Sequence, residues 1–179
     1  MRRSSNAALF WPVMLTVTVS DVITKQLALR FLHPRSMPRD IAGDWFRLAL
    51  VRNPGAAFGL NVGIYSRYIF MGLTIVALII LARLYKSTRV GDISRVMALA
   101  LVCGGAIGNL IDRVRSPFGV VDFIDIGLGD SRWPTFNIAD MAVSLGAFLL
   151  AWVLWGEDAA TENAVVATAP IGAERRELT

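Results

Sequence analysis

Four apolar segments alternate with polar stretches along the chain and predict four transmembrane helices. They run over residues 7–29, 68–85, 96–113 and 138–155. A helix needs about 20 mostly apolar residues to cross the hydrocarbon core of a bilayer. Arg2 and Arg3 precede the first segment as in a signal peptide, but its length and the lack of an Ala-x-Ala pattern after it favour a retained span. The pattern predicts a mainly α membrane protein.

The polar stretch between the first two spans, residues 30–67, is broken by prolines and glycines. Apolar and polar residues alternate from Trp45 to Arg52 and predict a short strand. The run Asn53-Pro54-Gly55 then predicts a turn, after which residues 56–60 return apolar side chains toward the membrane. We expect a small extramembrane sheet here.

The third apolar segment is rich in small residues. Gly104 and Gly108 lie four residues apart in the third segment and predict a close approach of a neighbouring backbone.

Beyond the fourth segment, residues 156–179 are rich in alanine and in charged residues and have no clear periodicity. This tail is predicted to be disordered.

Composition supports the membrane assignment. Hydrophobic residues make up 55% of the 179 residues, and the mean hydropathy is +0.54. The net charge is +4, but the basic residues flank apolar runs, where anionic lipid headgroups are the expected partner. We expect no nucleic-acid binding, because no basic surface interleaved with aromatic residues is present. The single Cys103 and single His33 exclude an intrachain disulfide and a Cys/His zinc site.

Four spans place the chain's polar motifs on one side of the membrane. The end of the first helix, the stretch 30–67, the end of the third helix and the start of the fourth must share that side. Candidate site residues that can therefore converge are Asp21, Lys25, Asn53, Asn109, Asp112, Arg113, Asp122, Asn137 and Asp140. Basic residues are evenly divided between the two sides, so the positive-inside rule does not set the orientation.

Asp122 and Asp140 are the strongest catalytic candidates. Asp122 lies between Val121 and Phe123 without an adjacent cation, so desolvation is expected to raise its pKa. Asp140 follows Asn137 at the spacing of a capping box, and on spacing alone a helix cap explains it equally well. Two carboxylates in opposed environments are what an aspartic hydrolase needs, one ionised to take a proton from water and one protonated to polarise the scissile carbonyl.

Two pairs of charged residues have simpler structural interpretations. Asp21 and Lys25 lie one helical turn apart on the same face, and a pair that fixes the end of the helix is favoured over a catalytic role. Asp112 beside Arg113 suggests a neutralised pair, with Arg113 or Asn109 free to hold a substrate carbonyl or headgroup.

Other chemistries fit less well. Cys103 lies in mid-helix among apolar residues, far from His33, and Ser20 and Lys25 point to different helix faces. An alternative from another class is a non-enzymatic membrane binder or a transporter that uses the aspartates as a proton or cation relay. The polar residues gather at one membrane face, whereas a relay needs a path across.

Four motifs carry a resemblance to a known family. They are Asn53-Pro54-Gly55-Ala56-Ala57-Phe58, the run from Gly104 to Arg113, Val121-Asp122-Phe123 and Phe136-Asn137-Ile138-Ala139-Asp140. In this order, and with this hydropathy, the chain from Asp21 to about Trp155 resembles lipoprotein signal peptidase, also called signal peptidase II. The resemblance implies an intramembrane aspartic endopeptidase that removes signal peptides from diacylglyceryl-modified bacterial prolipoproteins, cutting before the lipidated cysteine.

The resemblance also implies roles for individual residues. Asp122 and Asp140 would be the catalytic pair, and the positions that line or brace the site would be Asp21, Lys25, Asn53, Gly55, Asn109, Asp112, Arg113, Asn137 and Ala139. No metal or organic cofactor would be required. The expected partners are lipid-modified prolipoprotein signal peptides, membrane phospholipid and globomycin-type inhibitors.

For architecture, the resemblance implies a single peptidase domain over residues 1–155 in the bacterial inner membrane. Both termini would be cytoplasmic, and the site would face the periplasmic leaflet. Residues 30–67 would form a periplasmic β-cradle, and the loop between the third and fourth helices would carry a short helix or lid over the substrate.

Overall fold

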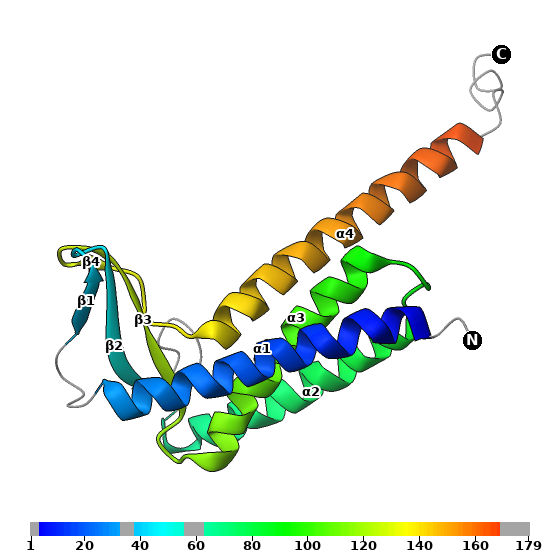
Figure 1. Ribbon diagram of the computed structural model, residues 1–179. Coiled ribbons are helices and arrows are strands. Elements are labelled where there is room, and N and C mark those ends of the chain that lie inside the picture. The colour runs from blue at the N-terminus through cyan, green and yellow to red at the C-terminus, as the bar shows by residue number, and fades with distance from the viewer. Residues whose placement is uncertain (1–3, 33–37, 56–62, 169–179) are drawn as a thin grey trace.

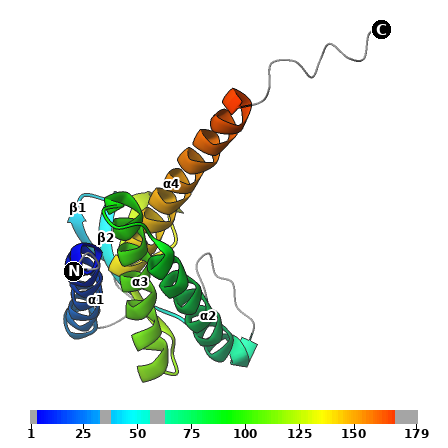
Figure 2. The ribbon, with the colours of Figure 1, turned by 90° about the vertical axis from the view of Figure 1, so that its right-hand side faces the viewer.

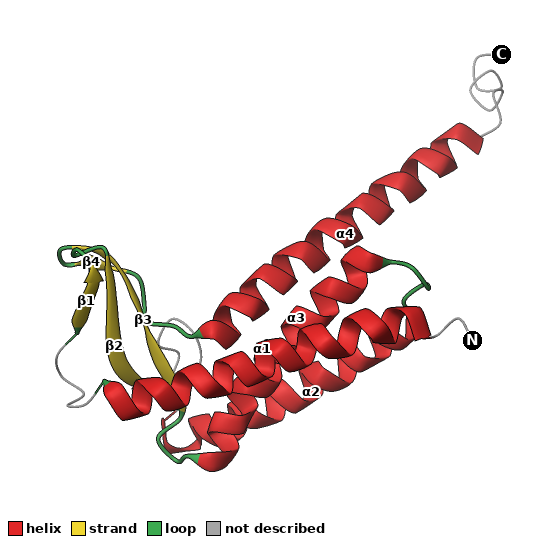
Figure 3. Ribbon diagram, viewed as in Figure 1, coloured by secondary structure: helices red, strands yellow, loops and turns green. Residues whose placement is uncertain are grey.

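The computed structural model describes residues 4–32, 38–55 and 63–168 and shows a helical bundle with a small sheet at one end (Figures 1 and 3). The long helices are α1 (Ser4–Phe31), α2 (Ser66–Ser87), α3 (Ile93–Arg115) and α4 (Ile138–Thr168). Each contains a stretch long and apolar enough to cross a membrane. The prediction of a mainly helical protein with four helices capable of spanning a membrane is confirmed.

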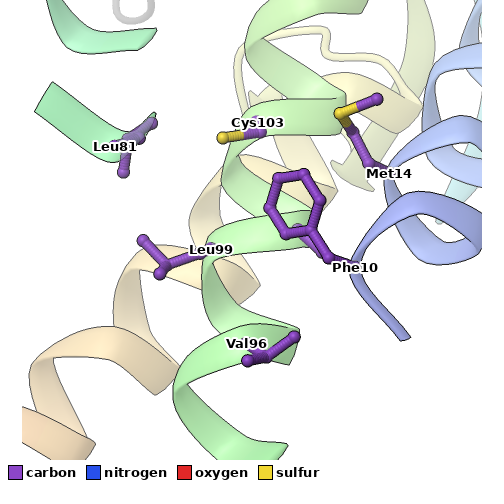
Figure 4. Packing of buried hydrophobic residues seen from close by; sticks show 7 residues of the cluster. Phe10, Met14, Leu81, Val96, Leu99 and Cys103 are labelled. Carbon is purple, nitrogen blue, oxygen red and sulfur yellow. The ribbon is translucent and has the colours of Figure 1, made fainter. Parts of the chain in front are cut away.

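Helix α3 lies at the centre of the bundle and packs against each of the other three helices (Figure 2). One hydrophobic core joins α1, α2 and α3, with Phe10, Met14, Leu81 and Leu99 buried around Cys103 (Figure 4). The outer faces of α1, α2 and α4 carry exposed large apolar side chains, as expected of helices that contact lipid.

Close approach of the helices depends on glycines of α3. A Cβ atom on Gly104 would lie 2.9 Å from the carbonyl oxygen of Met14 in α1, and one on Gly105 would collide with the carbonyl of Ala139 in α4. A Cβ on Gly108 would collide with the carboxylate of Asp21. The close approach of a neighbouring backbone is therefore confirmed at Gly104, whereas Gly108 makes room for a side chain.

The sheet is antiparallel with the order β1-β2-β3-β4. Its strands are β1 (Arg39–Ala42), β2 (Phe46–Asn53), β3 (Val120–Leu128) and β4 (Ser131–Arg132). The strand predicted near residues 45–52 is confirmed as β2. A three-residue 3-10 helix, η2 (Gly63–Tyr65), precedes α2.

Two expectations about the segments outside the bundle need correction. The sheet was expected within residues 30–67, but half of its strands come from the segment between α3 and α4. That segment was expected to carry a short helix or lid, whereas it forms β3 and β4. The physical reason is its sequence, because β-branched Val120, Val121 and Ile124 favour a strand that is buried against β2. The expected return of residues 56–60 to the membrane lies outside the described residues.

The predicted end of the fourth helix is also too early. Helix α4 continues past Trp155 to Thr168, so the first part of the tail predicted to be disordered is helical. Residues 156–168 contain no proline and several alanines and glutamates, which favour continuation of a helix once it has formed.

The described ends of the elements confirm the expected convergence. The end of α1, the end of α3 and the starts of α2 and α4 gather at the same end of the bundle as the sheet (Figure 1). Motifs separated by a hundred residues in sequence are thereby brought together.

Candidate active site

A cavity of about 530 Å³ lies where the sheet meets the ends of α3 and α4. Its polar lining comes from Asn53 of β2, Asn109 and Arg113 of α3, Asp122 of β3 and Asp140 of α4. The apolar part of its wall includes Val51, Ile126, Trp133, Phe136 and Met141. Both predicted catalytic aspartates therefore line one cavity.

Asp122 is the third residue of β3, lies opposite Val51 of β2 and is only 2% exposed. Its carboxylate accepts hydrogen bonds from the side-chain amides of Asn137 (Nδ2 to Oδ1, 2.7 Å) and Asn53 (Nδ2 to Oδ2, 3.2 Å). Burial, and next the charge of Asp140, raise the pKa of Asp122 to about 7, although the two amide hydrogen bonds act in the opposite direction. Asp122 therefore holds a proton more readily than an ordinary aspartate, in agreement with its apolar sequence neighbours.

Asp140 lies in the first turn of α4 and forms a capping box with Asn137. The backbone N–H of Asn137 donates to Asp140 Oδ2 at 3.2 Å, and the backbone N–H of Asp140 donates to Asn137 Oδ1 at 2.9 Å. The other carboxylate oxygen of Asp140 accepts a hydrogen bond from Asn109 Nδ2 at 2.8 Å. The capping interpretation is confirmed, and the same residue also lines the cavity.

Asn137 is the link between the two carboxylates. Its side chain is fully buried, and Nδ2 lies 2.7 Å from Asp122 Oδ1, 3.2 Å from the Val121 carbonyl and 3.3 Å from Asn109 Oδ1. Since its oxygen caps α4, the orientation of this amide is fixed by partners on both sides. Asn137 thereby holds β3 and α4 in one arrangement.

A buried charge cluster lies beside this pair. Lys25 Nζ is 2.7 Å from Asp21 Oδ2 and 3.1 Å from Asp112 Oδ2, and it donates to Asn109 Oδ1 at 2.8 Å. Asp21 Oδ1 accepts the backbone N–H of Ala139 at 2.9 Å. Asp21 and Lys25 form the predicted pair, and through these partners the pair connects α1 with α3 and α4.

The predicted pairing of Asp112 with Arg113 is wrong. Asp112 pairs with Lys25 and accepts the backbone N–H of Val121 at 3.0 Å, whereas Arg113 donates to the carbonyl oxygens of Gly55 (2.9 Å) and Asn109 (3.3 Å). Consecutive residues on a helix point about 100° apart, which directs these two side chains to different neighbours.

Asn109 also differs from expectation. Either Arg113 or Asn109 was expected to be free for substrate, but the amide nitrogen of Asn109 bonds Asp140 and its oxygen bonds Lys25 and Asn137. Asn109 therefore connects the buried charge cluster to Asp140. Gly55, another expected site residue, donates its N–H to Asn53 Oδ1 at 3.0 Å and presents its carbonyl to Arg113.

Comparison with known proteins identifies the family. Residues 13–156 match the family described as signal peptidase (SPase) II. The chain belongs to the signal peptidase II family. It is 42% identical over 140 residues to the lipoprotein signal peptidase of Syntrophus aciditrophicus, covering 75% of this chain and 84% of that protein. It is 38% identical over 146 residues to the lipoprotein signal peptidase of Moorella thermoacetica, covering 81% and 91%.

The fold of this signal peptidase II is similar to that of a solved bacterial membrane enzyme. The TM-score is 0.73 at 29% identity, with 82% of this chain and 87% of the other covered. The family and the four apolar helices together make this chain a multi-pass bacterial membrane peptidase.

Two features of this signal peptidase II were missed by sequence reasoning. Arg67, at the start of α2, donates to the carbonyl oxygens of Arg113 and Val114 and so caps the end of α3. Asp125 is 6% exposed and lies between Arg47 and Arg132. These partners come from separate segments, and no spacing rule relates them.

Proposed function

We propose that this signal peptidase II removes signal peptides from bacterial prolipoproteins, cutting before a diacylglyceryl-modified cysteine, with Asp122 and Asp140 as the catalytic pair. The similarity to lipoprotein signal peptidases supports the substrate class. The observation that carries the assignment of the pair is that both carboxylates line one cavity and both are bonded by Asn137.

The two carboxylates have the opposed environments that acid–base catalysis requires. Asp122 is buried, and its pKa of about 7 favours the protonated form near neutral pH. Asp140 lies in the first turn of α4, where its carboxylate accepts the backbone N–H of Asn137. We assign Asp122 as the resting acid and Asp140 as the resting base of a pair that shares one proton.

Hydrolysis then follows from these two protonation states. Asp140 takes a proton from water as the water oxygen bonds to the scissile carbonyl carbon, while Asp122 gives its proton to the carbonyl oxygen. The product is a neutral tetrahedral diol. The C–N bond breaks as Asp140 returns its proton to the leaving amine, and Asp122 recovers a proton from one hydroxyl as the C=O bond forms again. The reaction consumes one water and leaves both carboxyls as they began.

The surroundings of the pair have supporting roles in this proposal. Arg113 lines the cavity and positions the substrate backbone. The remaining residues brace the pair: Asp21, Lys25, Asn53, Gly55, Asn109, Asp112, Asn137 and Ala139. The lipidated cysteine enters sideways between helices with its acyl chains in the bilayer. In this arrangement both termini are cytoplasmic and the site faces the periplasmic leaflet.

The proposal is tested with a gel-shift assay on a diacylglyceryl-modified prolipoprotein in detergent or vesicles. Asp122→Asn and Asp140→Asn are each expected to abolish cleavage, since each removes a group that must exchange a proton. Asp130→Asn, in the exposed turn between β3 and β4, is the matched control and should cleave normally. Globomycin should block the wild-type reaction. Cleavage by either site variant at a rate near that of the control contradicts the assignment.

A further inference from the structure

The far end of the sheet, here called the sheet tip, consists of residues 41–45 and 127–132. It is built from two turns that lie side by side. The N–H of Gly127 donates to the Trp45 carbonyl at 3.0 Å, and the N–H of Gly129 donates to Asp44 Oδ2 at 2.6 Å. Arg132 Nη1 donates to the Asp44 carbonyl at 2.7 Å. The segment after α1 and the segment after α3 are thereby joined at this point.

A buried ionic cluster supports the sheet tip from inside. The carboxylate of Asp125 lies 3.1 Å from Arg47 Nε and 2.8 Å from Arg132 Nε, and Arg47 also pairs with Asp44 at 3.4 Å. A carboxylate held by two guanidinium groups from neighbouring strands has few alternative arrangements. The turns of the sheet tip are therefore fixed in position.

The sheet tip exposes large apolar side chains beside its exposed polar residues Asp44, Asp130 and Ser131. Ile41, Trp45 and Leu128 come from both turns and are 56%, 56% and 71% exposed. Large apolar side chains exposed on two joined segments are unfavourable in water and mark an interaction surface. Trp in particular is enriched at membrane–water interfaces, where its ring meets lipid and its N–H meets headgroups.

The place of the sheet in the molecule indicates what this surface contacts. The sheet lies at the end of the bundle where α1 ends and α4 begins, which is the level at which the spanning helices leave the membrane (Figure 1). The strands run across the direction of the helices, so the sheet tip projects sideways from the end of the bundle and does not continue along its axis (Figure 1). A projection at this level lies against the surface of the surrounding bilayer.

We propose that the sheet tip is a membrane anchor, with Ile41, Trp45 and Leu128 inserted at the boundary between lipid headgroups and acyl chains. Trp133 lines the cavity next to the sheet tip. Its backbone N–H donates to the Ile126 carbonyl at 2.8 Å. The anchor therefore sets the height of the cavity wall relative to the lipid interface. The contact with lipid stands whether or not the proposed cleavage reaction is correct.

The test places an environment-sensitive fluorophore on single cysteines in phosphatidylcholine–phosphatidylglycerol vesicles. Ile41→Cys and Leu128→Cys are labelled in a Cys103→Ala background, so that Trp45 is retained. Asp40→Cys is the matched control, because Asp40 is exposed on β1 next to Ile41 but carries a charged side chain that favours water over lipid. Nitroxide-bearing lipids and aqueous iodide serve as the two quenchers. Elution as a single species shows that each variant is folded.

Labels at positions 41 and 128 should emit at shorter wavelength than the label at 40, and lipid nitroxides should quench them several-fold more strongly. Trp45→Ala should reduce the lipid quenching at position 128, since the anchor loses its largest side chain. Equal quenching at positions 40, 41 and 128 overturns the proposal. Shielding from iodide without quenching by lipid also overturns it, because a second copy of the chain or another protein then covers the surface.

Discussion

Asn137 donates its side-chain amide to the Asp122 carboxylate at 2.7 Å. The oxygen of the same amide accepts the backbone N–H of Asp140 at 2.9 Å and so caps α4. One side chain therefore combines the start of a transmembrane helix with the position of a proposed catalytic acid. The oxygen of this amide stabilises the helix and, in the proposed mechanism, its nitrogen supports activity, so substitutions can separate the two effects.

Asn137→Ala is expected to lose both functions, whereas Asn137→Ser should lose one. Serine caps a helix well, but its hydroxyl is too short to replace the amide at Asp122. The loss of the cap alone costs about 1 kcal/mol of the free energy of unfolding. We expect Asn137→Ser to unfold at a higher temperature than Asn137→Ala in the same detergent, while both cleave far more slowly than the wild type. Equal unfolding temperatures in the two variants would contradict the capping role.

The raised pKa of Asp122 predicts an alkaline limit to activity. Asp122 is protonated below about pH 7 and ionised above it, so kcat/KM should fall above that pH if the protonated form is the acid. The hydrogen bond from Asn53 lowers this pKa. Asn53→Ala should therefore raise the pKa and move the alkaline limb of the pH profile to higher pH. The measurement is the pH profile of prolipoprotein cleavage. An alkaline limb that moves to lower pH in Asn53→Ala would contradict the assignment.

Lys25 is fully buried between two carboxylates, so its removal should be costly. Lys25→Met leaves Asp21 and Asp112 without their shared cation, and breaking a buried ion pair in this way costs about 3–5 kcal/mol. Lys86→Met, exposed at the end of α2, is the control and should change the free energy of unfolding by less than about 0.5 kcal/mol. Denaturant unfolding in detergent micelles measures the free energy of unfolding of both variants. Similar stabilities for the two variants would show that the cluster contributes little.

Gly105 is expected to tolerate no side chain. Its α-carbon lies so close to the Ala139 carbonyl that a methyl group would push α3 and α4 apart, and overpacking of this kind costs about 1–3 kcal/mol. In α2, Gly72 has open space around it, so Gly72→Ala should be neutral or slightly stabilising. Thermal unfolding of both variants in detergent is the measurement. A neutral Gly105→Ala would mean that the helices separate at no cost.

Features set by local sequence were predictable from the chain alone. The four spans follow from apolar length, β2 from its alternation, and the Asp21–Lys25 pair and the Asn137–Asp140 cap from residues three or four positions apart. Helix periodicity relates such residues directly, so little tertiary information was needed.

Features that join distant segments were not predictable by such rules. β3 pairs with β2 although some seventy residues separate Asn53 from Val120 in the sequence, and nothing local specifies that partner. Asp112 was assigned to its sequence neighbour, whereas its charge is neutralised by Lys25 of another helix. No role was predicted for Asp125, because its partners Arg47 and Arg132 lie on other strands. In each case the partner is chosen by packing.

The hydrogen bond from the Ala139 amide to Asp21 connects the first span to the last one. During synthesis α1 leaves the ribosome well before α4. Until α4 is made, Asp21 lacks its hydrogen bond from the Ala139 backbone. The cavity is finished only when residue 140 has been inserted. A partly made chain therefore lacks one wall of the cavity and one of its two aspartates, so the proposed site is assembled only when the last helix is in place.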